Sequence, residues 1–270
     1  MPLPLFQVDA FASGPFTGNP AGVVPLDGPA DAGWMQSVAM EMNLAETAFF
    51  YPEGDGYRLR WFTPTVEVEL CGHATLASAH VLYETGRLGP SDEARFDTAS
   101  GRLTVRAEPI PGEGGMRLVM DFPATPPTEV PAPEGLAEAL GVEPVWTGQS
   151  RGNIVAELPD DATVRALAPD LHALGALDTA GVVVTARADE GRGYDFVSRY
   201  FAPALGVPED PVTGSAHCKL APYWAAKLGR DALTGYQASA RGGLVGLRVR
   251  GDRVDLIGQA VTVFEGKLLV

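Results

Sequence analysis

The feature that most constrains this 270-residue chain is that its pattern of sequence signals occurs twice, in the same order. The run Arg60-Trp-Phe-Thr-Pro64 returns as Arg199-Tyr-Phe-Ala-Pro203, and in both places a polar or acidic loop, a small-residue turn and an apolar helix follow. One such match would be weak, but several elements matched in order indicate an internal duplication. The sequence therefore predicts two related halves.

The sequence of the first copy predicts many short strands interrupted by a few helices. Apolar residues at helical spacing predict an amphipathic helix over 31–43 and a largely apolar helix from about His73 to Thr85, with Gly86 at its C-terminal cap. Strands are predicted at 3–9, 21–26, 47–51, 57–62, 102–107 and 116–122.

A proline-rich stretch, 123–133, separates the copies, because prolines fix φ and remove backbone donors. The predicted division is a first half over 1–122, which a C-terminal strand at about 260–270 could complete, a linker over 123–133, and a second half over 134–259. In the second half we expect a helix around 163–174, a buried strand from Gly181 and an apolar helix that runs to about Lys227 through Pro222.

Both apolar helices are apolar around most of their circumference, so each needs to be enclosed on nearly all sides. Strands are what the chain supplies to enclose them. The predicted fold class is α+β (mixed α/β), with two pseudo-symmetric halves that each curl a β-sheet around a central helix.

Composition narrows the classes of function. A net charge of −14, with 20 basic residues and no basic run, argues against nucleic acid as a partner. No apolar segment reaches the roughly 20 residues of a membrane span, and the N-terminus lacks a signal-peptide pattern. Two cysteines, Cys71 and Cys218, form neither a disulfide framework nor a metal-ligand spacing. We expect a cytoplasmic protein, and no metal site built on cysteines.

The starts of the two apolar helices are the predicted site. A helix N-terminus offers free N–H groups and a positive dipole end, and glycine there allows a ligand to approach the backbone closely. Two such starts facing one crevice between the halves would hold a carboxylate-bearing molecule; the alternative is two ordinary starts capped by polar side chains. The turns are Cys71-Gly72-His73-Ala74-Thr75 and Thr213-Gly214-Ser215-Ala216-His217.

Groups that exchange protons gather in the same stretches. Glu46 precedes an apolar strand, where a charge has little reason to lie unless it faces a cavity, and the matching place near Gly181 has no acidic group. His73 and Asp210 are the other candidates. The alternatives are a turn or helix-end role for Glu46, a hydrogen-bonded structural role for His73, a capping role for Asp210, and core packing for Cys218.

Four runs of the sequence resemble the signatures of the PhzF (phenazine biosynthesis) family, in the family's order and over essentially the whole chain. The resemblance implies the diaminopimelate epimerase-like fold and often a homodimer. It also implies a cofactor-independent isomerase that moves a hydrogen on a small carboxylated metabolite. The runs are Gly18-Asn19-Pro-Ala-Gly-Val-Val24, Asn43-Leu-Ala-Glu46-Thr-Ala-Phe49, Cys71-Gly-His-Ala-Thr75 and Asp210-Pro-Val-Thr-Gly-Ser-Ala-His217.

By this resemblance Glu46 is the acid/base group, with His73, Asp210 and Ser215 around the substrate; Asn19, Cys71, Gly72, Ala74, Thr213 and Gly214 complete the predicted site. A raised pKa of the Glu46 carboxyl would help it act as an acid. Epimerases of this fold use two thiols, and here Cys71 holds the first thiol position while Asp210 stands where the second is expected. A Cys71-dependent epimerase, racemase or dehydratase remains an alternative, as does a binding or partner protein without turnover.

Overall fold

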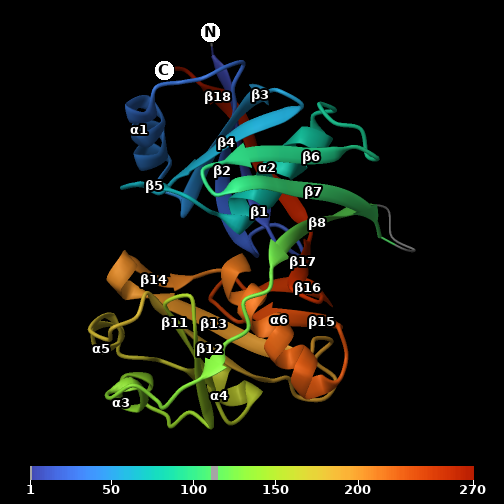
Figure 1. Cartoon of the computed structure of the whole chain (residues 1–270). Helices are drawn as coiled ribbons and strands as arrows, with labels where there is room; N and C mark the ends of the chain where they lie inside the picture. Colours follow the sequence, from blue (N-terminus) through green and yellow to red (C-terminus); the bar gives the residue numbers. More distant parts are fainter. Residues whose placement is uncertain (1, 111–114) are drawn as a thin grey trace. The chain divides into compact units, whose positions relative to one another are not determined.

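The computed structural model describes residues 2–110 and 115–270 (Figure 1). Its contacts divide into two compact units: unit 1 holds residues 1–121 and 257–270, and unit 2 holds 122–256. The boundaries fall inside two strands, β8 (Met116–Pro123) and β17 (Arg253–Gly258).

Unit 1 surrounds a buried helix, α2, with strands. Helix α2 packs against β1, β2, β3 and β18, and its side chains from His73 to Tyr83 are buried except His80. The shorter helix α1 covers part of the sheet through the cluster that contains Met35, Phe49 and Phe62. Besides β8, the elements are β1 (Leu3–Ala10), β2 (Asn19–Pro25), α1 (Ala32–Met42), β3 (Glu46–Glu53), β4 (Gly56–Phe62), β5 (Glu67–Val68), α2 (Gly72–Glu84), β6 (Glu93–Thr98), β7 (Gly101–Pro109) and β18 (Ala260–Leu268).

Unit 2 repeats this plan around helix α6, which packs against β15 and β16. A buried hydrophobic cluster of unit 2 includes Leu136, Val184 and Phe201. The elements of unit 2 are β9 (Thr128–Glu129), α3 (Leu136–Leu140), β10 (Trp146–Ser150), β11 (Asn153–Glu157), α4 (Asp161–Ala166), α5 (Leu171–Gly175), β12 (Gly181–Arg187), β13 (Phe196–Ala202), η1 (Pro203–Leu205), β14 (Val207–Asp210), α6 (Gly214–Leu228), β15 (Ala232–Gln237) and β16 (Gly243–Arg250).

Strand pairing confirms the internal duplication. In unit 1, β1 pairs antiparallel with β2, β2 parallel with β3, β3 antiparallel with β4, and β4 both antiparallel with β5 and parallel with β6. Unit 2 repeats each pairing in order, with β10 to β15 in place of β1 to β6. The register agrees as well, because Phe49 pairs with Arg60 as Val184 pairs with Arg199.

The prediction of a single helix over 163–174 was wrong. The structure has two short helices there, α4 and α5, which residues 167–170 separate. Pro169 lies in the gap, and a proline disfavours helical backbone at the preceding residue and cannot donate its own hydrogen bond. Asp160 and Asp170 each cap the helix that follows, accepting bonds from its first N–H groups.

Helix α6 continues through Pro222, which denies a hydrogen bond to the carbonyl of Cys218. That carbonyl instead accepts a bond of 3.0 Å from the backbone N–H of Thr125, in the proline-rich stretch. A backbone group that the sequence leaves unpaired is therefore satisfied by the segment that joins the two copies.

Candidate functional site

Neither central helix has an N-cap of the usual kind. Helix α2 starts after Cys71 and α6 after Thr213, and neither side chain accepts a bond from its helix; neither first turn carries an acidic residue. Helix α1, by contrast, is capped by Asp31. The starts of α2 and α6 thus keep free N–H groups and a positive dipole end, as an anion site requires. The alternative of ordinary capped starts is wrong for both helices.

In unit 1 the start of α2 brings together four of the predicted residues. Glu46, the first residue of β3, places its Oε2 atom 3.1 Å from Nε2 of His73. Asn19, the first residue of β2, places its amide nitrogen 3.1 Å from the other ring nitrogen, Nδ1. The Cys71 Sγ atom lies 3.5 Å from Nδ1. Asn19, Cys71 and His73 are buried, and the Glu46 side chain is 19% exposed.

The sequence Gly18-Asn19 is needed for this placement. Gly18 has a φ of 70°, and a Cβ atom there would lie 2.2 Å from the carbonyl oxygen of Ala10. Only glycine adopts such a conformation at such close approach without strain. The turn delivers Asn19 to the first position of β2, where its amide holds the His73 ring.

Charge pairing controls the protonation of the Glu46–His73 pair. Burial alone would raise the pKa of Glu46, but the His73 charge and hydrogen bonds from His73 and Cys71 outweigh it, and the pKa is lowered. Burial alone would lower the pKa of His73, but Cys71 and Glu46 raise it well above 6.5. Glu46 is the neighbour whose charge counts at neutral pH, because burial and Glu46 raise the pKa of the Cys71 thiol to about 11.

This corrects the expectation of a raised Glu46 pKa. Glu46 rests as a carboxylate, hence as a base, with an imidazolium beside it. The Asn19 amide can meet either form of the ring, with its nitrogen toward a neutral Nδ1 or, after a half-turn, its oxygen toward Nδ1–H. The atoms of Glu46, Cys71 and His73 lie within 4.8 Å of one another, a spacing that a metal ion could bridge. The ion pair itself accounts for this spacing, so we assign no metal.

In unit 2 the start of α6 brings together the remaining candidates. The Thr213 hydroxyl donates to the Asp210 carboxylate, so Thr213 does not cap the helix. Gly214 and Thr213 are buried, whereas Ser215 is exposed in the first turn. His217 bonds to the carbonyl of Thr213 through Nδ1, and burial lowers its pKa to about 4, so it is a neutral core residue.

Gln237 is the residue that sequence reasoning missed in this part of the site. It is fully buried on β15; its Oε1 accepts from the Thr213 N–H at 2.8 Å, and its Nε2 donates to the Asp210 carbonyl at 2.7 Å. Both ends of the loop before α6 are therefore fixed by one amide. No local sequence signal marks Gln237, since it reaches the loop from a strand that lies after the helix.

The duplication corrects one assignment. Cys71 and Thr213 each immediately precede their helix, so Thr213, not Asp210, matches the position of Cys71. The same offset matches His73 with Ser215. It matches Glu67 with Glu209 as well, and their ion-pair partners Arg60 and Arg199 are matched by strand register rather than by this offset. Both pairs use two hydrogen bonds, and both join the fourth strand of the repeat to the segment that leads into the helix.

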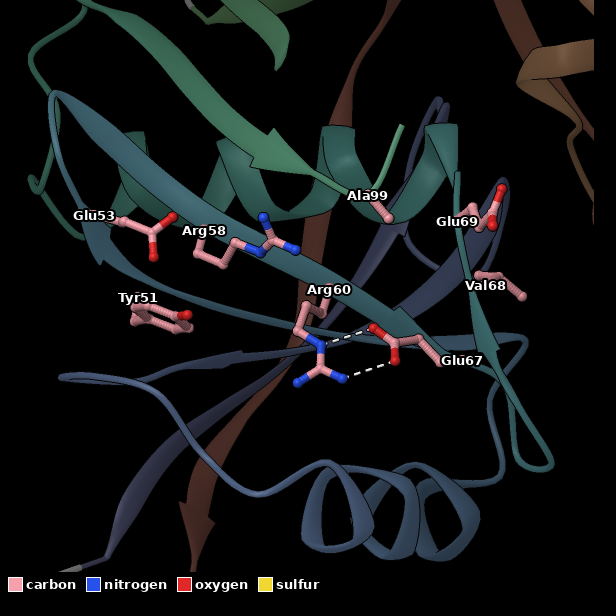
Figure 2. Close-up of a pocket in the computed structure, with 8 residues that line it drawn as sticks. All are labelled: Tyr51, Glu53, Arg58, Arg60, Glu67, Val68, Glu69 and Ala99. Atoms are coloured by element: carbon pink, nitrogen blue, oxygen red, sulfur yellow. Dashed lines mark hydrogen bonds and ion pairs between the residues drawn. The ribbon is translucent and has the colours of Figure 1, made fainter. Parts of the chain in front are cut away.

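Figure 2 shows the first of these pairs at the edge of a surface hollow of about 620 Å³. Arg60 and Glu67 face each other across β4 and β5, and Arg58 and Tyr51 lie farther along the same face. None of the predicted site residues lines this hollow. Its ion pair joins β4 to β5, the strand that lies just before Cys71 in the sequence.

The register also explains why the two copies differ chemically. Glu46 opens β3 as Gly181 opens β12, three residues before Phe49 and Val184 respectively. A Cβ atom on Gly181 would lie 2.5 Å from the Tyr200 hydroxyl. In unit 2, therefore, a tyrosine occupies the space beside the position where unit 1 carries its carboxylate.

Comparison with known proteins identifies the family. The model of the family described as phenazine biosynthesis-like protein (PhzC-PhzF) matches residues 8–266. The chain belongs to this family. Two curated relatives are named uncharacterized isomerases: one from Halalkalibacterium halodurans is 46% identical, with 100% of each chain covered, and one from Pseudomonas aeruginosa is 50% identical, with 99% of each covered.

Solved structures agree with this assignment. A PhzF family protein from Enterococcus faecalis superposes with a TM-score of 0.93 at 40% identity, with 100% of both chains covered. A hydroxyproline epimerase from Agrobacterium vitis, 12% identical, shares the fold with a TM-score of 0.62 over 99% of this chain and 92% of its own. The mixed α/β, epimerase-like fold is thus confirmed, and the names of the curated relatives support an isomerase type of function. No helix in the described part of the chain is long and apolar enough to cross a membrane.

Proposed function

We propose that the chain is a cofactor-independent isomerase in which Glu46 carries a proton between two carbons of a small, carboxylate-bearing metabolite. The observation that carries the proposal is the buried Glu46–His73 pair beside the uncapped start of α2. A carboxylate with a lowered pKa, next to a donor, is suited to remove a proton from a carbon.

In the proposed reaction, one oxygen of Glu46 takes a proton from a carbon next to an electron-withdrawing group, leaving the electron pair delocalised on the substrate. The protonated Glu46 then returns this proton to another carbon of the same molecule, so that atoms and charge balance without an oxidant. His73 holds Glu46 in place and stabilises its carboxylate form, and free N–H groups at a helix start bind the substrate carboxylate.

Two features of the chain, one in each unit, support Glu46 rather than Cys71 as the proton carrier. The thiol is buried, and its pKa of about 11 leaves it protonated at neutral pH, whereas a thiol base must be a thiolate. The matched position in unit 2 holds Thr213, which has no thiol to act from a second side. The participation of Asp210 and the homodimer stay predictions.

The test is deuterium incorporation. Wild type and Glu46→Gln are incubated in deuterated buffer with a pool of small carboxylic and amino acids and followed by NMR. We expect deuterium to enter a compound with wild type, and Glu46→Gln to lower that rate by about 10²–10⁴-fold, the usual contribution of a general base. The control is Glu84→Gln, at the exposed end of α2.

Equal rates for wild type and Glu46→Gln would refute the role of Glu46. Incorporation that disappears on alkylation of Cys71, and that substrate protects, would favour the thiol. A ligand that binds tightly but exchanges no hydrogen with solvent would favour a binding protein. A matched melting temperature of the two proteins shows that any loss is not a loss of fold.

A further inference from the structure

Lys219 is a buried cation without a counter-charge. It lies on α6, is 3% exposed, and its Nζ donates a single hydrogen bond, of 3.1 Å, to the carbonyl oxygen of Ser215. Within residues 2–110 and 115–270, no carboxylate forms an ion pair with it. Lysine is almost never fully buried unless it is paired, because a buried charge loses its hydration.

Packing does not explain this lysine. When the two copies are aligned by matching Cys71 with Thr213, Ala77 of α2 corresponds to Lys219 of α6. Ala77 is fully buried. The fold therefore fills the equivalent position in unit 1 with a small apolar residue. An ammonium group at this place in unit 2 has to be explained by something other than the core.

A second cation reinforces the first. Arg151, in the turn between β10 and β11, is exposed, forms no ion pair among the described residues, and is close enough to disfavour the charged form of Lys219. Two cations that repel each other without an intervening anion are unexpected in a chain with 34 acidic and 20 basic residues. An anion between or beside them would relieve the repulsion.

The direction in which Lys219 extends indicates where such an anion would lie. Its Nζ reaches back one turn to Ser215, in the first turn of α6, where the N–H groups of Gly214 and Ser215 have no capping side chain. Ser215 is exposed, so this end of the cationic region is open to a ligand. One carboxylate of a ligand is enough to accept hydrogen bonds from the N–H groups at the start of α6. The additional positive charge of Lys219 and Arg151 favours a ligand with a second carboxylate.

We propose that unit 2 binds a dicarboxylate, with one carboxylate at the start of α6 and the other paired with the Lys219 ammonium. Lys219 is then a residue that determines specificity, selecting ligands with two negative charges over those with one. This inference rests on the proposed function only for the class of ligand, a small carboxylated molecule. It is tested by binding without turnover, so the two can fail separately.

The test compares malonate with acetate at constant ionic strength, by calorimetry and by thermal shift of the full chain. We expect wild type to bind malonate at least tenfold more tightly than acetate. Lys219→Met should reduce this preference to about twofold or less and should raise the melting temperature of the free protein, since it removes an unpaired buried charge.

The matched control is Lys227→Met, on the same helix, where the lysine is exposed and already paired with Glu157; it should keep the wild-type preference. Arg151→Met, at a surface turn, provides a second variant that does not touch the core and should lower the preference in part. The inference is overturned if wild type shows no preference for malonate, or if Lys219→Met retains it. Loss of the preference in Lys227→Met as well would also overturn it, since the effect would then be one of general charge.

Discussion

Replacement of His73 by leucine tests the electrostatic account of the site most directly. His73→Leu keeps a buried side chain of similar size but removes the partner of Glu46, whose carboxylate lies 3.1 Å away. At that distance and an effective dielectric constant of about 20, the attraction is about 5 kcal/mol before desolvation is subtracted. Loss of one partner of a fully buried pair costs about 3–5 kcal/mol. Because the Glu46 side chain is 19% exposed, we expect about 2–3 kcal/mol at pH 7.

The sign of the pH dependence follows from the two pKa shifts. In wild type, the lowered pKa of Glu46 gives stability that is present above about pH 4.5 and is lost as pH falls through the folded pKa. The raised pKa of His73 gives stability that is present below 6.5 and is lost as pH rises through the folded pKa. The stabilisation by the pair is therefore fully present between about pH 4.5 and 6.5.

In His73→Leu, burial acts on Glu46 with only the Cys71 hydrogen bond to oppose it, so its pKa rises above 4.5. The variant should then lose stability as pH rises from 4 to 7, at about 1.4 kcal/mol for each unit by which the pKa is raised. Urea unfolding at pH 4 and pH 7 measures this change in the free energy of unfolding. One m-value, the slope of that free energy against urea concentration, is used for all the fits. The control is His80→Leu on the same helix, whose neighbour Glu84 is exposed.

A loss of stability that is equal at pH 4 and pH 7 would refute the reasoning, because a packing defect is independent of pH whereas an unpaired carboxylate is not. A carbon-13 NMR titration of the Glu46 carboxyl group gives the same answer at the level of the residue. Its pKa must lie below 4.5 in wild type and above 4.5 in the variant.

Two further predictions concern the differences between the copies. Cys71→Ala should leave deuterium incorporation within about tenfold of wild type, because the thiol is protonated and Glu46 is the proposed proton carrier; a loss as large as that of Glu46→Gln would contradict this. Gly181→Ala should cost about 1–3 kcal/mol in urea unfolding, because its Cβ would meet the Tyr200 hydroxyl at 2.5 Å. The control Gly28→Ala, with no atom within 4 Å of the added Cβ, should stay close to wild type.

Much of the fold could be predicted because it depends on local signals. The expected helix at 73–85 is α2 at 72–84, and the expected strand at 57–62 is β4 at 56–62. The prediction of one helix over 163–174 was wrong because it followed the apolar spacing across Pro169. The steric effect of this proline on the preceding residue outweighs the helical periodicity of the apolar residues. The repeat was visible because matched residues, such as Arg60 and Arg199, lie within short similar runs that occur in the same order in both copies.

The site was less predictable because its chemistry depends on contacts distant in sequence. The sequence pointed to Glu46 and His73 separately, but the direction of the pKa shift of Glu46 depends on whether burial or the imidazolium dominates, which only their 3.1 Å contact decides. Gln237 was missed for the same reason, since it lies 24 residues from the Thr213 backbone that it binds. Lys219 was passed over because a lysine in a helix is unremarkable until its burial is known.

The matched positions relate the two proposals, chemistry in one copy and ligand recognition in the other, to one duplicated scaffold. Both copies keep the parts that set the backbone: the arginine–glutamate pair before the helix, the uncapped helix start, and the strand register. Among the differences between the copies, two matched pairs place a charged residue in one copy only: Glu46 of unit 1 matches Gly181 of unit 2, and Lys219 of unit 2 matches Ala77 of unit 1. A buried charge is stable only with a partner: Glu46 has His73, whereas Lys219 has none within the described chain, and this difference makes Lys219 the position where a ligand is expected to supply the missing charge.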